Sequence, residues 1–338
     1  MKPFFSVMIP VYNVKDYLDN CMSTILNQTF DDYEVILVDD GSTDGSGDIC
    51  DRYQFQNPEK VRVVHKENGG LLSARRVGVA VAEGKYGAFV DSDDYVSNDF
   101  LQVIYETIIK NEQPDVVIYN FARHFEVDDS IVINEPVFKN GTLFRGNKEQ
   151  VYDKLISGYS LNNLWAKSVK MDLIKNDDTE FERYYKNSFG EDLLQSLYPI
   201  TYADKIVYID SVLYYYRINA QSMTAAKNFS VVKKQNNPYI FYVMQEYISK
   251  WELDKCAYLK KLFARRYNHL AINFFRYYKA ETCADNKKEL IQIFKSYFKE
   301  MRNENLWSNG SIPLKRKLII FLVNIGSFRL LQLLMFFN

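Results

Sequence analysis

The sequence holds few of the side chains that disulfides, thiolate metal sites or histidine metal sites require. Its 338 residues include four cysteines and three histidines, and the cysteine spacing fits neither a metal site nor a redox pair. Cys21 falls on the apolar stripe of an expected helix, so we predict buried, reduced thiols in a cytoplasmic protein. Lys2 is followed at once by a short apolar strand and a polar turn, which argues against a secretory signal peptide.

An excess of charge of one sign is also missing: 42 Lys and Arg face 43 Asp and Glu, for a net charge of −1. No overall field therefore attracts nucleic acid, and we expect no such partner. The GxGxxG turn is absent after the first strand, which disfavours an NAD-dependent oxidoreductase. Aromatic residues, at 15%, are plentiful; they suit sugar-binding surfaces and membrane interfaces, but a Tyr-rich core would also explain them.

The first 120 residues alternate between strand and helix patterns, which predicts an α/β fold with a mostly parallel sheet flanked by helices. Apolar runs predict strands at 4–10, 33–38, 61–65, 86–90 and 115–120. The clearest helix runs from Val14 to Leu26, where apolar residues recur at intervals of three and one. This alternation is typical of a nucleotide-binding half-fold.

After residue 120 the pattern becomes mixed. Short strands are expected at 131–133, 205–209 and 212–217, and helices at 148–157 and 191–198. From about residue 228 onward the chain is helical in character. We therefore expect one domain over 1–225, with halves at 1–120 and 121–225, and a helical C-terminal region at 226–338.

Polar clusters follow four of the expected strands, at 10–13, 39–42, 65–70 and 91–93. In an open parallel sheet, ligands bind outside the carboxyl ends of the strands. Each cluster alone could be a turn or a helix cap, with Asn13 and Asp44 as the expected caps. Together at one edge, they predict a ligand site.

The sharpest cluster is Asp91-Ser92-Asp93, directly after an apolar strand. Two carboxylates that flank one residue can hold a hard divalent cation, Mn²⁺ or Mg²⁺, together with a diphosphate. The sequence therefore predicts a divalent metal as cofactor at this motif.

The segments MIPVYN, ILVDDGSTDGS, KENGGLLSARR and FVDSDD, in this order and spacing, resemble the family 2 glycosyltransferases, which have the GT-A fold. The resemblance is close over 4–125 and looser over 160–225. It implies a nucleotide-binding half at 1–120, an acceptor-binding half at 121–225, and an inverting transferase of bacterial surface-polysaccharide type. The nucleotide-sugar site would then include Pro10, Val11, Tyr12, Asp39, Asp91 and Ser92, with Asp93 on the metal.

Asn68, Gly69 and Arg75 follow the third strand and are expected to complete the nucleotide-sugar site. Glycine allows a close backbone approach, and Arg75 lies where it could reach phosphate or nucleobase. On spacing alone, a surface arginine on an amphipathic helix is an equal alternative.

Glu191 and Asp192 open an expected helix, and the resemblance assigns this pair to catalysis, with Asp192 as the general base. Inverting transfer needs one carboxylate to take the proton of the acceptor hydroxyl. Acidic residues are also favoured at a helix N-terminus, which is the alternative.

Three further side chains follow from the resemblance. Trp165 and Lys167 are expected at the acceptor, with an ordinary core Trp as an equal alternative for the first. Arg217, with the segment 221–224, is expected in a lid near the diphosphate, where arginine could pair bidentately.

The processive-synthase motif QxxRW is absent, which favours one sugar per encounter. Lys315-Arg316-Lys317 precedes an interrupted apolar segment, so we expect peripheral contact with the inner face of the cell membrane. A terminal helix docked on protein, or a homo-oligomer contact, is the alternative. We expect a UDP-sugar donor and a saccharide or lipid-linked saccharide acceptor. The rival hypothesis is a non-catalytic sugar-nucleotide-binding or scaffold protein.

Overall fold

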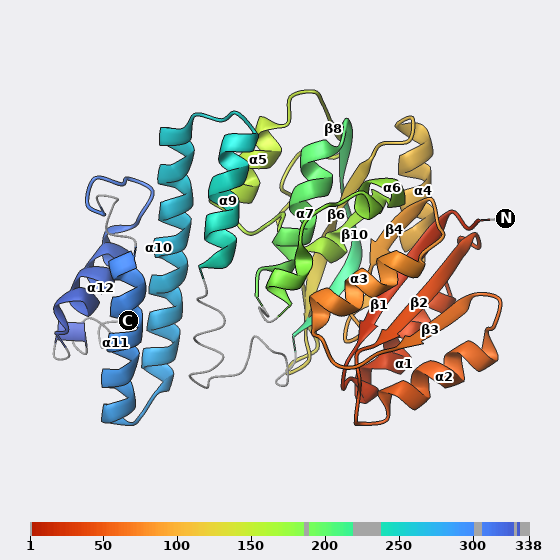
Figure 1. Ribbon diagram of the computed structural model, residues 1–338, viewed down its shortest axis with the longest axis horizontal. Helices are drawn as coiled ribbons and strands as arrows, with labels where there is room; N and C mark the ends of the chain where they lie inside the picture. The colour runs from red at the N-terminus through yellow and green to blue at the C-terminus, as the bar shows by residue number, and fades with distance from the viewer. Residues whose placement is uncertain (1, 186–188, 219–237, 301–305, 328–329, 332–338) are drawn as a thin grey trace. The chain divides into compact units, whose positions relative to one another are not determined.

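The computed structural model describes residues 2–185, 189–218, 238–300, 306–327 and 330–331 (Figure 1). Contacts divide the chain into two compact units: Met1–Lys148 with Ser160–Ala226, and Glu149–Tyr159 with Lys227–Asn338. The segment Glu149–Tyr159, expected in the first domain, therefore belongs to the second unit.

The first unit is built on a ten-stranded sheet within the described residues. Four strands pair in parallel in the order β3-β2-β1-β4, namely β1 (Phe5–Val11), β2 (Tyr33–Asp39), β3 (Val61–His65) and β4 (Tyr86–Phe89). The helices α1 (Lys15–Leu26), α2 (Ser46–Gln56) and α3 (Leu71–Val81) connect them. This arrangement confirms the expected alternation of strand and helix. The alternation arises because two parallel strands need a crossover connection between them.

The sheet continues through β9 (Lys167–Lys170), β6 (Val116–Phe125) and β10 (Lys205–Ile218). β9 is antiparallel to both β4 and β6, so β6 and its parallel neighbour β10 run in the same direction as β1 to β4, and the sheet is mixed. The strands β5 (Tyr95–Val96), β7 (Ser130–Ile133) and β8 (Thr142–Arg145) pair antiparallel. The two strands expected at 205–209 and 212–217 are one strand, whose register shifts between Tyr208 and Tyr214.

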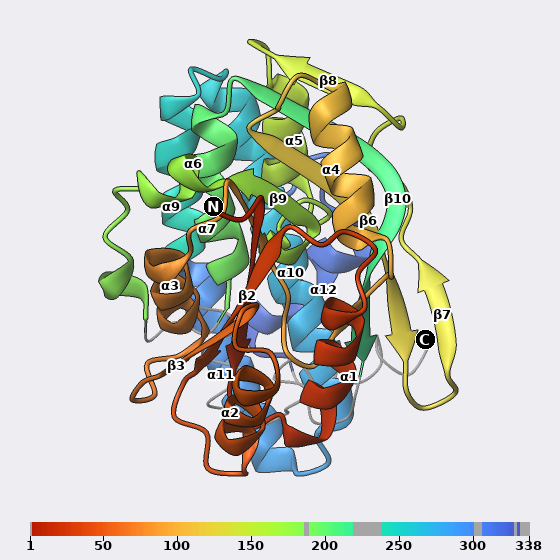
Figure 2. The ribbon, with the colours of Figure 1, turned by 90° about the vertical axis from the view of Figure 1, so that its right-hand side faces the viewer.

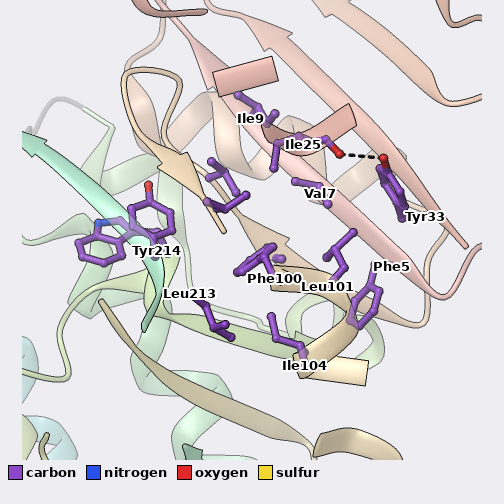
Figure 3. Packing of buried hydrophobic residues seen from close by; sticks show 14 of the residues in the cluster. Phe5, Val7, Ile9, Ile25, Tyr33, Phe100, Leu101, Ile104, Leu213 and Tyr214 are labelled. Atoms are coloured by element: carbon purple, nitrogen blue, oxygen red, sulfur yellow. Dashed lines mark hydrogen bonds between the residues drawn. The ribbon is translucent and has the colours of Figure 1, made fainter. Parts of the chain in front are cut away.

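Helices cover both faces of this sheet (Figure 2). On one face, alternate β1 residues Phe5, Val7 and Ile9 pack in a buried cluster with α1 and with α4 (Phe100–Lys110), as Figure 3 shows. On the other face lie α3, α6 (Met171–Lys175) and α7 (Glu191–Tyr202). Gly87 makes room for this packing, since a Cβ at this position would lie 2.7 Å from Sδ of Met171 and would displace that side chain.

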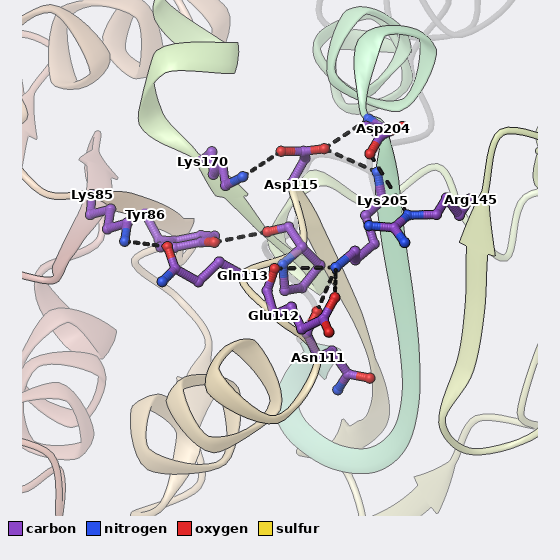
Figure 4. A network of polar contacts seen from close by, with 11 residues as sticks. Lys85, Tyr86, Asn111, Glu112, Gln113, Asp115, Arg145, Lys170, Asp204 and Lys205 are labelled. Atoms are coloured by element: carbon purple, nitrogen blue, oxygen red, sulfur yellow. Dashed lines mark hydrogen bonds and ion pairs between the residues drawn. The ribbon is translucent and has the colours of Figure 1, made fainter.

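A polar network fastens one edge of the sheet (Figure 4). Asp115, just before β6, accepts from Nζ of Lys170 at 2.6 Å and from the backbone N–H of Asp204 and Lys205 at 2.7 and 3.0 Å. These contacts join the starts of β6 and β10 to the end of antiparallel β9. The network therefore lies at the end of the sheet opposite to the carboxyl ends of β1, β2 and β4. The polar clusters lie at those carboxyl ends.

Of the two expected helix caps, the one at Asn13 is wrong. Asn13 has φ of +52° and its Oδ1 accepts from the backbone N–H of Thr43 at 2.8 Å, while α1 begins after Val14 without a side-chain cap. Asp44 is confirmed as a cap of α2, because its Oδ1 accepts from the N–H of Ser46, the first residue of that helix, at 2.9 Å, although Gly45 is the residue at the N-cap position. Its Oδ2 also accepts from the N–H of Lys15, so Asn13 and Asp44 both tie the loop after β2 to the start of α1.

The cysteines are only partly as expected. All four are free, but Cys21 and Cys50 are buried whereas Cys256 and Cys283 are exposed.

The second unit is helical where described. It contains α5 (Glu149–Ser157), α9 (Tyr239–Lys250), α10 (Lys255–Ala280), α11 (Ala284–Glu300) and α12 (Leu314–Ile325). Phe274, Phe294 and Val323 are fully buried in the core shared by α10, α11 and α12. No helix in the described part of the chain combines the length and the apolar character needed to cross a bilayer.

Candidate functional site

The predicted nucleobase residues lie at the ends of the two neighbouring strands β1 and β2. Pro10 and Val11 are buried, Val11 is paired with Asp39 in register, and Tyr12 is half exposed. Backbone pairing thus brings Asp39 next to Val11 and Tyr12, which lie 27 or more positions earlier in the chain, as the sequence predicted.

The carboxylate of Asp39 is held by Ser42 in the loop after β2 and by His65 at the end of β3. Its Oδ1 accepts from the N–H of Ser42 at 3.0 Å, and its Oδ2 lies 2.9 Å from Nδ1 of His65. Burial acts to raise the pKa of Asp39, but the hydrogen bonds from Ser42 and His65 outweigh it and leave the pKa below its ordinary value. The hydrogen bonds to Asp39 and Asp51 raise the pKa of His65. The carboxylate of Asp39 is therefore a fixed, ionised acceptor.

Asp40 is a residue that sequence reasoning missed. Its buried carboxylate accepts from the N–H of Gly69 at 2.9 Å and of Gly70 at 2.7 Å, and it pairs with Nζ of Lys66. Its carbonyl accepts from Nδ2 of Asn68 at 3.1 Å. Asp40 therefore fixes the loop that carries Asn68 and Gly69. The available signal was a second aspartate at the end of the β2 strand.

The Asp91-Ser92-Asp93 motif follows β4, as predicted, and the next residue anchors it. Asp94 is fully buried; its Oδ2 accepts from the Tyr214 hydroxyl at 2.6 Å and its Oδ1 from the N–H of Arg217 at 2.7 Å. The Tyr214 oxygen also accepts from the N–H of Asp91 at 3.1 Å. Strand β10 thereby fixes the backbone of the motif.

The Asp93 carboxylate receives no hydrogen bond and no ion pair from another described residue. Burial, and then the charge of Asp91, raise the pKa of Asp93 to about 6. A cation at this point would favour the ionised carboxylate. Among the described residues no group of three or more side chains is placed to hold a metal ion. An ion on Asp93 would therefore need ligands from outside these side chains, such as phosphate and water, which is how Mg²⁺ commonly binds.

Arg75 lies between two predicted site residues, and its side chain has no exposed surface. Its Nη2 donates to Oδ1 of Asp91 at 2.7 Å, and its Nη1 donates to Oδ1 of Asp192. Burial opposes its charge, but Asp192 and Asp91 outweigh burial and raise the pKa of Arg75. The alternative of a surface arginine is thus excluded, and the two halves of the first unit meet at one guanidinium.

Glu191 and Asp192 begin α7 as predicted, but their surroundings differ. Oε2 of Glu191 is buried without a hydrogen-bond partner, and burial, followed by the charge of Asp192, raises the pKa of Glu191 to about 8. The Asp192 side chain is 22% exposed and is paired with Arg75 through Oδ1 alone. Glu191 therefore favours its protonated form at neutral pH, whereas Asp192 is ion-paired.

The two predicted acceptor residues are internal. Trp165 is buried and stacks on Tyr214 with ring centroids 4.3 Å apart. Lys167 is buried too; its Nζ donates to the carbonyls of Leu161 and Asn163 at 2.8 and 2.5 Å, and burial lowers the pKa of Lys167 to about 7. These contacts favour the packing role for Trp165, and they give Lys167 a role in holding the loop before β9.

Arg217 lies near the Asp91–Asp94 motif, but its donors are largely occupied. Its Nε donates to the carbonyl of Asp93 at 2.8 Å, Nη2 to Oδ1 of Asn20 at 2.7 Å, and Nη1 to Oε1 of Glu126 at 3.3 Å. The side chain is 12% exposed. The segment 221–224, predicted to form a lid with it, lies outside the described residues.

Comparisons with known proteins give a consistent picture. The family model described as Glycosyl transferase family 2 matches residues 6–166. GlyG of Streptococcus pneumoniae, a glycosyltransferase, is 33% identical over 66% of this chain and 73% of its own length. Glycosyltransferase GlyA of the same organism is 31% identical over 65% of this chain, but the match spans only 31% of GlyA.

The crystal structure of S. aureus TarS 1-349 in complex with UDP-GlcNAc has the same fold. The TM-score is 0.67 over 99% of this chain and 90% of that chain, at 20% sequence identity. This likeness confirms the expected GT-A architecture, including the helical C-terminal region.

Proposed function

The chain belongs to glycosyl transferase family 2, and from that membership we propose that it transfers a single sugar from a nucleoside-diphosphate sugar to a saccharide hydroxyl, with inversion. The observation that carries this proposal is the guanidinium of Arg75, which binds both Asp91 and Asp192. It keeps a carboxylate from α7 next to the motif proposed to hold the donor. Proton abstraction from an acceptor needs a base within such reach of the reacting carbon.

The proposed donor site runs along the carboxyl ends of β1, β2 and β4. The nucleobase would lie against Pro10, Val11 and Tyr12 and donate to Asp39, with Asp91 and Ser92 toward the ribose. Asn68 and Gly69 would border the nucleotide from the loop that Asp40 fixes. A uracil base is our first choice, supported by the UDP-GlcNAc complex of TarS.

Asp93 is the residue proposed to hold Mn²⁺ or Mg²⁺, and its surroundings fit a hard cation. Its carboxylate oxygens have no competing donor from another described side chain. Burial, and then the neighbouring charge of Asp91, raise the pKa of Asp93 in the absence of a cation. When bound, the ion would neutralise charge on the departing nucleoside diphosphate.

The transfer itself is a single displacement. The acceptor oxygen forms a bond to the anomeric carbon, while the bond from that carbon to the β-phosphate oxygen breaks and its electron pair leaves with the nucleoside diphosphate. The acceptor proton passes to Asp192, whose Oδ2 is not engaged by Arg75. Glu191 is the less suitable base because its buried carboxyl favours the protonated state at neutral pH.

The proposed acceptor is a saccharide or a lipid-linked saccharide of a bacterial surface polysaccharide, on the resemblance of the motif-bearing half. A lipid-linked acceptor requires contact with the cytoplasmic face of the membrane, and α12 offers a surface for it. Four α12 side chains form an exposed apolar stripe, Leu314, Leu318, Phe321 and Ile325, with 36–67% exposure. Lys315 and Arg316 flank the stripe, which suits anionic lipid headgroups.

The test has two stages. Thermal-shift screening with UDP-, GDP- and dTDP-sugars, with and without Mn²⁺, identifies the donor. Release of the nucleoside diphosphate from that donor is then followed in the wild type and in Asp192→Asn. A loss of about 10²–10⁴-fold with unchanged donor affinity supports the proposal. Donor binding without any turnover by the wild type, across saccharide acceptors, would support the non-catalytic binding protein instead.

A further inference from the structure

We propose that Arg75 is a positioning residue that fixes Asp192 relative to Asp91, and through Asp91 relative to the bound donor. This inference rests on the proposed function, because it takes Asp192 as the base. It also replaces the expectation that Arg75 itself contacts phosphate or nucleobase. The two carboxylates belong to the loop after β4 and to the first turn of α7, 101 positions apart in the chain.

Arg75 binds only one of the two oxygens of each carboxylate. Arg75 engages Oδ1 of Asp91 with Nη2 and Oδ1 of Asp192 with Nη1, so one terminal nitrogen serves each partner. No hydrogen bond from a described residue reaches the second oxygen of either side chain. One oxygen of Asp91 thus remains for the donor, and one oxygen of Asp192 remains for the acceptor proton.

The burial of Arg75 separates positioning from direct binding. Its side chain has no exposed surface, whereas those of Asp91 and Asp192 are 21% and 22% exposed. A ligand can therefore reach the two carboxylates without displacing them, but it cannot reach the guanidinium. Arg75 acts on the reaction only through the residues that it holds.

Arginine is the side chain that this role demands. A guanidinium presents its N–H donors in a rigid plane and can hold two carboxylates at a fixed separation, whereas an ammonium is a point charge on a flexible stem. Nε of Arg75 is buried without a partner, which costs stability. The arrangement leaves this donor unsatisfied but keeps the two terminal contacts, one to each carboxylate.

The charges around Arg75 also support a role in holding Asp91 and Asp192 in place. Asp192, Asp91 and Glu191 all act on the guanidinium, in that order of strength. One fixed positive charge therefore offsets two nearby carboxylates and leaves the third, Glu191, to favour its protonated form. Loss of the guanidinium would leave Asp91 and Asp192 to repel each other and move apart.

The matched control is the next residue. Arg76 lies on the same helix, donates to the carbonyl of Ile174 at 3.4 Å and lies over the Phe181 ring at 4.6 Å, away from both aspartates. Arg75→Lys and Arg76→Lys make the same chemical change on one helix, but only the first breaks the link between Asp91 and Asp192.

The experiment measures turnover and binding separately, with the donor selected by the thermal-shift screen and with UDP plus Mn²⁺ in calorimetry. Arg75→Lys should lower kcat by about 10²-fold, the effect of a small misplacement of a reacting group, and leave the Kd for UDP nearly unchanged. Arg76→Lys should change neither. Weaker UDP binding by Arg75→Lys at unchanged kcat would show that Arg75 is a donor ligand, and would overturn the inference.

A double-mutant cycle with Asp192→Asn decides through which residue Arg75 acts. If it acts through Asp192, adding Arg75→Lys to Asp192→Asn should lower the residual rate by no more than about twofold, the scatter of independent effects. An equal loss in both backgrounds would overturn the inference. If Arg75→Lys does not fold, Arg75→Gln, which keeps an N–H donor, takes its place in the cycle. Full turnover by Asp192→Asn alone would overturn the assignment of Asp192 as the base, and with it this inference, whereas the proposed transfer reaction would stand.

Discussion

The hydroxyl of Tyr214 donates to the fully buried carboxylate of Asp94 at 2.6 Å, and the same oxygen accepts from the N–H of Asp91 at 3.1 Å. One side chain of β10 thus holds both ends of the Asp91–Asp94 segment. The ligand-binding motif after β4 is therefore shaped by a residue 120 positions away in the chain.

Tyr214→Phe should lower the free energy of unfolding by about 1–3 kcal/mol, because it leaves a buried carboxyl without one of its two donors. Urea unfolding measures the effect. Tyr215→Phe is the control: this neighbouring ring stacks on Tyr95 at 4.8 Å, and its hydroxyl has no partner among the described residues. Equal losses in both variants would contradict the role given to the Tyr214 hydroxyl.

Asp93→Asn should weaken Mn²⁺-dependent binding of UDP by at least roughly tenfold, since even partners outside a metal's first coordination shell have effects of that size. Isothermal titration calorimetry with and without Mn²⁺ separates the metal-dependent part from the rest. Metal-free UDP binding should change little, because the proposed nucleobase contacts lie on β1 and β2. Unaltered affinity in the presence of Mn²⁺ would remove Asp93 from the metal site.

Glu191→Gln should stabilise the protein at pH 8 more than at pH 5. The folded state raises the pKa of Glu191 to about 8 from an ordinary value near 4.5, so the folded state holds a proton that the unfolded state releases. Stability therefore falls as the pH rises from about 4.5 to 8, and glutamine removes this dependence. Urea unfolding of both proteins at the two pH values measures it.

The same variant also bears on catalysis. Glutamine resembles protonated glutamic acid in shape and hydrogen bonding, so Glu191→Gln should keep most of the turnover at pH 7. An inactive Glu191→Gln beside a fully active Asp192→Asn would exchange the two assignments.

Leu318→Ser with Phe321→Ser should reduce binding to vesicles that contain anionic phospholipid, since burial of each apolar side chain contributes about 1.5–3 kcal/mol. Co-sedimentation measures it, and zwitterionic vesicles test the part of Lys315 and Arg316. Point substitutions are preferable to removal of α12, because Ile319, Ile320 and Val323 on its other side are buried in the core of the second unit. If vesicle binding persists while the oligomeric state changes, the stripe is a protein contact instead.

Much of the nucleotide-binding half follows from the sequence alone. β3 was predicted residue for residue, and β1, β2 and β4 to within one residue at each end, because their apolar runs are bounded by polar turns. The positions of Asp39 and of Asp91 to Asp93 follow as well. In a parallel sheet, whatever comes after a strand must lie at the carboxyl edge.

Other features of the fold could not be predicted from local sequence patterns. β9 is a four-residue strand whose lysine, serine, valine and lysine show no marked alternation, and it exists because β4 and β6 both pair with it. The cap expected at Asn13 failed for a similar reason: its side-chain oxygen accepts from the N–H of Thr43 across the loop, which residue type cannot reveal.

By itself the sequence determined the alternation of elements, the edge of the sheet where ligands bind, and the acidic residues that lie there. Tertiary structure alone decided which of those residues are engaged and by what. It placed Trp165 and Lys167 inside, turned Arg75 toward Asp91 and Asp192, and gave adjacent Glu191 and Asp192 different surroundings. The physical reason is that order along the chain fixes a residue's position on its strand or helix, whereas burial and ion pairing depend on which distant segments fold against it.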